Sequence, residues 1–250
     1  DDEVAERRKR GWGLTRPELA VLLAYSKIWL NNHLLASDVP EDPYLSNELT
    51  RYFPAPIRER FGRTIVRHRL RREIIATATT NSLINRMGPT FVPRAQDETG
   101  ADPAQIARAY TAAREIFDMR ALWAQIEGLD NRVPAKVQYA MHFQTARLLR
   151  HMTYWLLAHR KQELHIDEAV AEFRKGVRQL ESDISHILSG AERERFEKTR
   201  KQHADAGVPH ELAARVASLE CHNAALDIVE LAALHRASVT EAGRVYFDLG

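Results

Sequence analysis

The sequence has little sulfur and no long apolar run. It contains one cysteine, Cys221, among 250 residues, so an internal disulfide is excluded and a reducing, cytoplasmic setting is favoured. No apolar stretch approaches the ~20 residues that a membrane-spanning helix needs. Residues 1–13, DDEVAERRKRGWG, lack the apolar segment of a signal peptide. We therefore expect a cytoplasmic protein with no membrane partner.

An excess of charge of one sign is also missing. The chain has 36 basic and 34 acidic side chains, and hydrophobic residues make up 44% of it. Such a balance predicts neither a nucleic-acid partner nor a membrane-surface partner from net charge alone. The composition is that of a soluble globular protein, and the length is sufficient for a sizeable hydrophobic core.

Motifs for cofactors and metals are absent as well. Gly11 and Gly13 begin a pattern resembling a dinucleotide-binding loop. The full pattern needs a third glycine at position 16, which is Arg, and a preceding strand, which the sequence does not predict, so the motif is not present. The eleven histidines are scattered, and Cys221 and His222 are adjacent, a spacing that does not suit a shared metal ion. We expect no cofactor and no metal in this chain. Cys221 paired with a distant His could act as a nucleophile, but the apolar residues around it favour a small buried side chain.

No segment alternates between apolar and polar residues as a half-buried strand does. Helical periodicity runs along most of the chain, so we predict an all-α fold: an irregular multi-helix bundle of nine or ten helices with no significant sheet. The clearest start signal is Thr15-Arg-Pro-Glu18, a capping box with Pro17 in the first turn. The other expected helices span residues 64–87, 102–118, 120–128, 134–159, 167–184, 191–206 and 209–235, with a last one capped by Thr240.

One region is strongly basic. Seven arginines between residues 58 and 72 are opposed by Glu59 alone. On the expected helix 64–87, Arg63, Arg67 and Arg71 are four residues apart and would share one face. The side chains expected to be buried beside them are Val66, Leu70 and Ile74. Such a face suits nucleic-acid phosphates or an acidic protein surface. The global charge balance and the lack of interleaved aromatics favour a protein interface or a solvated face, which makes nucleic acid an unlikely partner.

Several stretches together resemble a known family. The chain is similar to the C-terminal part of the large bacterial NAD-specific glutamate dehydrogenases, in family order and over nearly its whole length. The stretches that carry this resemblance are GLTRPELAVLLAYSKI (13–28), EIIATATTNSLINRMGPTFV (73–92), ETGA (98–101), AYTAAREIFDMRALWAQIEGLDNRVPAKVQ (109–138) and GRVYFDLG (243–250).

The resemblance implies that the parent enzyme oxidises L-glutamate to 2-oxoglutarate and ammonia with NAD. Its lysine, acidic residue and cofactor domain would precede residue 1, so no catalytic residue is assigned here. Residues 1–13 would then be a charged linker from that catalytic domain. Residues 14–250 would be the helical C-terminal domain, with 14–100 and 101–250 as candidate sub-bundles. Thr15 and Glu18 match the family signature, but we interpret them as a structural cap.

Three hypotheses follow. The first is an accessory domain of a glutamate dehydrogenase that assists packing, oligomerisation or regulation, with the upstream catalytic domain and further copies of the parent as partners. The second is a stand-alone nucleic-acid-binding module that uses the Arg-rich helix. The third is an independent enzyme that uses a His or Cys221. The resemblance favours the first.

Overall fold

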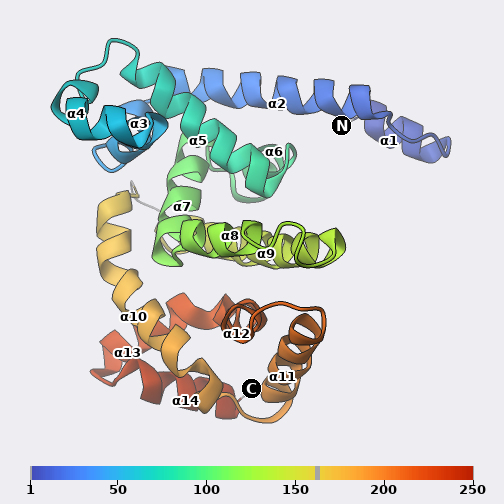
Figure 1. The fold of residues 1–250 in the computed structure, drawn as a ribbon. Helices are drawn as coiled ribbons and strands as arrows, with labels where there is room; N and C mark the ends of the chain where they lie inside the picture. Colours follow the sequence, from blue (N-terminus) through green and yellow to red (C-terminus); the bar gives the residue numbers. More distant parts are fainter. Residues whose placement is uncertain (1, 161–163, 250) are drawn as a thin grey trace. The chain divides into compact units, whose positions relative to one another are not determined.

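The structure is a computed structural model that describes residues 2–160 and 164–249. Within these ranges it contains fourteen α-helices, two short 3-10 helices and no strand, which confirms the predicted all-α fold. The helices outnumber the nine or ten expected for two reasons. Asp2–Lys9, Ser46–Tyr52 and Ala55–Ile65 are helical although no helix was predicted over most of these segments, and the predicted helix 209–235 is interrupted. The chain divides into two compact units, Asp1–Ala107 and Arg108–Gly250, and each is described by itself (Figure 1).

The first unit is organised around the pairing of α2 with α5, to which η1 and α3 add (Figure 1). Leu30 and Leu34, near the end of α2, are fully buried, and Leu83 of α5 is buried with them. The elements of this unit are α1 (Asp2–Lys9), α2 (Arg16–Ala36), η1 (Val39–Glu41), α3 (Ser46–Tyr52), α4 (Ala55–Ile65), α5 (Arg71–Met87) and α6 (Phe91–Thr99). The boundary between the units falls within α7 (Pro103–Ile116).

The predicted start of α2 is confirmed. The Thr15 hydroxyl accepts a hydrogen bond from the Glu18 amide at 3.4 Å, and the Glu18 carboxylate accepts one from the Thr15 amide at 2.8 Å. Arg7 donates to the same carboxylate at 2.7 Å. These hydrogen bonds, led by the one from the Thr15 amide, lower the pKa of Glu18 to about 2, so the cap carries its negative charge at neutral pH.

The predicted helix 64–87 is confirmed over Arg71–Met87, but its predicted start is wrong. α4 ends at Ile65, the chain turns through residues 66–70, and α5 begins at Arg71. Two local features explain the break. Thr64, Ile65 and Val66 form a β-branched run, which is mediocre in helices. Beyond it, the ring Nδ1 of His68 accepts the Leu70 amide hydrogen at 3.1 Å and so competes with a helical backbone bond.

The second unit packs α10 against α12, α13 and α14, while α9 packs on α8, α12 and η2. Phe173 and Leu180 of α10 are fully buried. Its helices are α8 (Met119–Glu127), α9 (Ala135–His159), α10 (Ile166–Ile187), α11 (Gly190–Asp205), α12 (His210–Ser218), η2 (Cys221–Ala224), α13 (Ala225–His235) and α14 (Val239–Leu249). The predicted helix 209–235 is therefore two helices joined by a 3-10 turn.

Polar contacts connect elements of this unit that are distant in sequence. The indole Nε1 of Trp155 donates to Asp227 at 2.8 Å, and the Trp155 ring packs edge-on against Phe173 at 5.5 Å between centroids. The predicted cap of the last helix is wrong: the Ser238 hydroxyl accepts the Glu241 amide hydrogen at 3.2 Å. Thr240 instead donates to Asp183 of α10 at 2.6 Å and so ties α14 to α10.

Candidate functional site

The structure separates the three arginines that were predicted to share one helix face. Arg63 lies on α4, Arg67 lies in the turn, and Arg71 is the first residue of α5. Arg63 and Arg67 are exposed. Val66 and Leu70, which were expected to be buried, are 48% and 50% exposed. The single basic face beside a buried apolar edge is therefore wrong, because the helix that would carry it is broken at residues 66–70.

Arg71 has a structural partner that the sequence pattern did not indicate. Glu41 of η1 accepts hydrogen bonds from Arg71 and, at 2.5 Å, from Arg72. These two bonds, that of Arg72 first, lower the pKa of Glu41 below its ordinary value. Arg72 also donates to the carbonyls of Leu35 and Ser37 at 2.8 and 3.2 Å. The pair therefore joins the start of α5 to the end of α2 and to η1.

The remaining arginines form an exposed basic surface on α4 and the following turn. No ion pair involving them is found among the described contacts. Arg60 lies 5.2 Å from the ring centre of Phe61, which is 44% exposed. Arginine on an exposed apolar patch suits an acidic protein surface with some apolar contact. We call this set the basic surface; it consists of Arg58, Arg60, Arg63, Arg67 and Arg69.

Cys221 and His222 occupy structural positions. Burial, followed by the nearby Glu192 and Glu220, raises the pKa of the Cys221 thiol to about 12. A nucleophilic cysteine must be a thiolate, so Cys221 does not suit that role. His222 is buried, its Nδ1 lies 2.7 Å from the Ser218 carbonyl, and burial lowers its pKa. Among the described residues, no three His, Cys, Asp or Glu side chains gather as a metal site would require.

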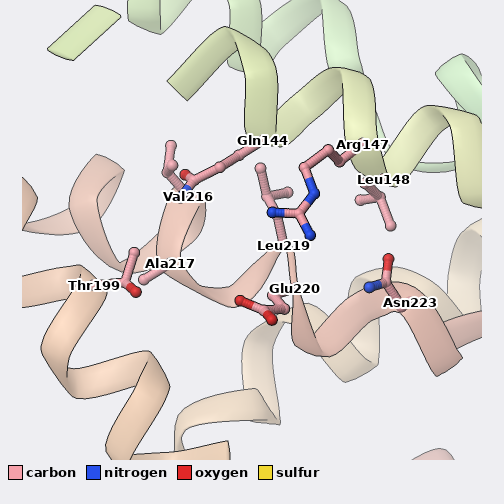
Figure 2. A pocket seen from close by; sticks show the side chains of 9 residues that line it. All are labelled: Gln144, Arg147, Leu148, Thr199, Val216, Ala217, Leu219, Glu220 and Asn223. Carbon is pink, nitrogen blue, oxygen red and sulfur yellow. The ribbon is translucent and has the colours of Figure 1, made fainter. Parts of the chain in front are cut away.

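A small polar pocket lies between α9, α11, α12 and η2. Figure 2 shows Arg147 reaching from α9 toward Glu220 and Asn223. The pocket has a volume of about 40 Å³, enough for a few water molecules at about 10–15 Å³ each. Its lining residues are Gln144, Arg147, Leu148, Thr199, Val216, Ala217, Leu219, Glu220 and Asn223.

A larger apolar groove runs between α11, α13 and α14, with a volume of about 670 Å³. Leu231, Val245 and Phe247 contribute to its wall, while Glu192 and Glu241 contribute carboxylates. Hydrogen bonds from the Ser238 amide and hydroxyl lower the pKa of Glu241, so it is ionised at neutral pH.

The glycine pair near the amino terminus does not fit a dinucleotide. The segment before Gly11 and Gly13 is helix α1, whereas the dinucleotide fingerprint follows a strand and opens a helix. Gly11 and Gly13 therefore do not form a dinucleotide fingerprint.

Comparison with known proteins identifies the family. The model of the family described as glutamate dehydrogenase, C-terminal, matches residues 11–250. The chain belongs to this family. It is 40% identical to an NAD-specific glutamate dehydrogenase of Halomonas elongata and 40% identical to one of Pseudomonas aeruginosa, over 250 residues in each case. It is 34% identical over 249 residues to one of Mycobacterium tuberculosis. The resemblance noted in the sequence is thereby confirmed.

Each comparison covers 100% of this chain but 15% of the length of the relative. The glutamate dehydrogenase C-terminal family is thus represented over almost the whole chain, while most of each relative has no counterpart in it. None of the helices in the described part of the chain is both long and apolar enough to cross a membrane.

Proposed function

We propose that this chain is the C-terminal helical domain of an NAD-specific glutamate dehydrogenase. The complete enzyme would convert L-glutamate, NAD and water to 2-oxoglutarate, ammonia and NADH in the cytoplasm. The observation that carries the proposal is the coverage: the whole chain matches 15% of each of three proteins that bear this name. The reaction would therefore take place in the part of the polypeptide that precedes the domain.

The domain itself would be an accessory one. Its candidate reactive groups serve the fold: Cys221 is a buried thiol, Glu18 caps a helix, and Glu41 binds two arginines. Catalytic groups usually line a cleft and have pKa values suited to proton transfer or nucleophilic attack near neutral pH, unlike these three. We infer that the domain assists interdomain packing and oligomerisation of the parent enzyme.

The basic surface is the contact we propose for the catalytic region or for a neighbouring subunit. Arg63 and Arg67 are its central members, whereas Arg71 is already bound to Glu41. In the complete enzyme, the double variant Arg63→Glu/Arg67→Glu should weaken assembly by ~30-fold or more, since a disrupted interface charge costs about 2–5 kcal/mol. The isolated chain should lose no more than ~0.5 kcal/mol of stability, as is usual for exposed charges.

Three preparations test the proposal: the 250-residue chain, the complete enzyme, and the enzyme shortened to end at residue 13. NADH formation from glutamate and NAD is measured together with assembly by size-exclusion chromatography. We expect the chain to be inactive, the complete enzyme to be active, and the shortened enzyme to lose assembly and activity together. Glutamate oxidation by the chain alone would refute the accessory role, and so would a fully active, normally assembled shortened enzyme.

A matched charge reversal on the second unit controls for net charge. Lys175→Glu/Lys198→Glu changes two exposed lysines on α10 and α11 and should leave assembly unchanged. The nucleic-acid alternative predicts instead that the isolated chain shifts RNA or DNA in a salt-sensitive manner, and that Arg63→Glu/Arg67→Glu abolishes the shift. A gel-shift titration at two salt concentrations separates the two partners.

A further inference from the structure

Helix α2 has a docked end and an exposed end. Its last third contacts α5 and η1 through Leu30 and Leu34, both fully buried. From the start of the helix to Ile28, no side chain is buried, although the sequence there is strongly apolar. We call the exposed large side chains of this part the α2 apolar surface; their exposed fractions are Leu19 48%, Val21 54%, Leu23 36%, Tyr25 68% and Ile28 56%.

The α2 apolar surface extends around the helix. At 3.6 residues per turn, Leu19 and Leu23 lie on one side. Val21, Tyr25 and Ile28 lie on the opposite side. A helix that is apolar all round is characteristic of a segment enclosed within a larger core, whereas a surface helix is apolar along one stripe. Few charges interrupt the exposed part, and one of them, Glu18, is used by the cap.

The exposed part is nevertheless a well-defined helix. The Thr15–Glu18 capping box closes its first turn, and Arg7 donates to Glu18 at 2.7 Å. At the other end, Arg72 donates to the carbonyls of Leu35 and Ser37. With both ends held, the helix presents its apolar side chains without needing to fold on binding, which lowers the entropic cost of association.

We propose that the α2 apolar surface is enclosed by the polypeptide that precedes this domain in the complete enzyme. This inference rests on the proposed function. The family match begins at residue 11, immediately before α2, and the chain spans 15% of the length of each relative. α2 therefore begins close to the point where the family match begins, and it carries unburied apolar residues on opposite sides, whereas the preceding helix α1 is mostly charged.

Two other occupants suit the geometry less well. A second copy of the chain, paired through α2, would cover a narrow seam of about two residues in every seven and would leave the opposite side exposed. A lipid surface suits a helix with one apolar face and one strongly charged face, which the exposed part of α2 does not have. A polypeptide that surrounds the helix covers both sides.

Cysteine labelling tests the proposal directly. Tyr25→Cys is the reporter because Tyr25 is the most exposed member of the α2 apolar surface, while the buried Cys221 thiol is shielded from reagent. Lys198→Cys on α11 is the control. Both variants are made in the 250-residue chain and in the complete enzyme, and the rate of maleimide labelling is measured. We expect the cysteine at position 25 to react at least ~10-fold more slowly in the complete enzyme, and the cysteine at position 198 to react equally in both.

Three results would overturn the proposal. Equal, fast labelling at position 25 in both proteins would mean that nothing covers α2. Slow labelling in a monomeric 250-residue chain would mean that the chain covers α2 by itself. Labelling of the chain that slows as its concentration rises, together with a dimer in sedimentation, would identify a second copy as the occupant.

Glutamate oxidation by the same complete-enzyme preparations is a separate readout. An active preparation in which position 25 labels fast refutes this inference and leaves the proposed function intact. If position 25 is protected while the unsubstituted complete enzyme does not oxidise glutamate, the docking of α2 is supported and the proposed function is refuted.

Discussion

Two helices of the second unit, α10 and α13, pack closely at Gly176. A Cβ added at this position would lie 2.7 Å from Cγ2 and 2.9 Å from Cγ1 of Val229. Val229 is buried and β-branched, so its methyl groups cannot move away by a simple rotation. We therefore expect Gly176→Ala to force α10 and α13 apart.

The magnitude follows from two opposing terms. Overpacking of a tight interface costs about 1–3 kcal/mol, and Ala is favoured over Gly in a helix by about 1 kcal/mol. The net loss should be as much as ~2 kcal/mol. At Gly243 of α14, the nearest atom to an added Cβ is the terminal Cδ1 of Ile187, at 2.8 Å, which can rotate away, so Gly243→Ala should be close to neutral. Gly62 of α4 has no atom within 4 Å of an added Cβ, and Gly62→Ala should stabilise by about 0.4–1 kcal/mol.

Urea denaturation followed by tryptophan fluorescence measures these effects, since Trp155 contacts Phe173 of α10 and reports on this interface. The double variant Gly176→Ala/Val229→Ala removes the methyl groups in question. Gly176→Ala should therefore cost less, or become stabilising, in the Val229→Ala background. If Gly176→Ala stabilises the chain as much as Gly62→Ala does, or if its cost is the same with and without Val229→Ala, the steric argument is refuted.

The remaining predictions concern the α2 cap and the pH dependence. Thr15→Ala should fray the first turns of α2 at a cost of about 0.5–2 kcal/mol, seen as faster amide hydrogen exchange there; unchanged exchange would contradict this. The pKa of Glu18 is about 2 in the folded chain, against an ordinary value of 4.5. Its contribution to stability is therefore fully present above pH 4.5 and is lost as the pH falls toward 2. We expect Glu18→Gln to lose helicity already at neutral pH, whereas the unsubstituted chain should lose it only in strong acid. Burial lowers the pKa of His203 from its ordinary 6.5, so the fold binds its proton less readily than the unfolded chain does. The free energy of unfolding should fall as the pH drops below ~6.5. In urea titrations at several pH values, His203→Gln should make this fall less steep. An equally steep fall in the variant would show that His203 is not its cause.

The parts of the fold that the sequence predicted were those with local causes. The Thr15–Glu18 cap depends on residues three apart, and Asp102 accepts the Gln105 amide hydrogen at 2.8 Å as the expected start of α7. The absence of an alternating pattern likewise predicted a fold without sheet. Each of these features is determined within about one helical turn, so composition and spacing are sufficient to recognise it.

The parts that the sequence did not predict depend on distant partners. The interruption at residues 66–70 removed the shared arginine face, and Arg71 and Arg72 bind Glu41 about thirty positions earlier in the chain. Thr240 was expected to cap a helix, but it donates to Asp183, 57 positions away. Helical periodicity alone cannot show which arginine meets a carboxylate, because tertiary contacts decide it. The charge of the basic surface was recognisable in the sequence, but the solvent exposure of its arginines could be seen only in the structure.

We propose that the reaction of the parent enzyme takes place outside this domain. Calorimetric titration of NAD into the 250-residue chain, with and without L-glutamate, tests it most directly. We predict no saturable heat, since Gly11 and Gly13 follow a helix, whereas the dinucleotide fingerprint follows a strand. Saturable NAD binding that is abolished by a single substitution within residues 14–250, such as Leu231→Glu in the groove, would contradict the account.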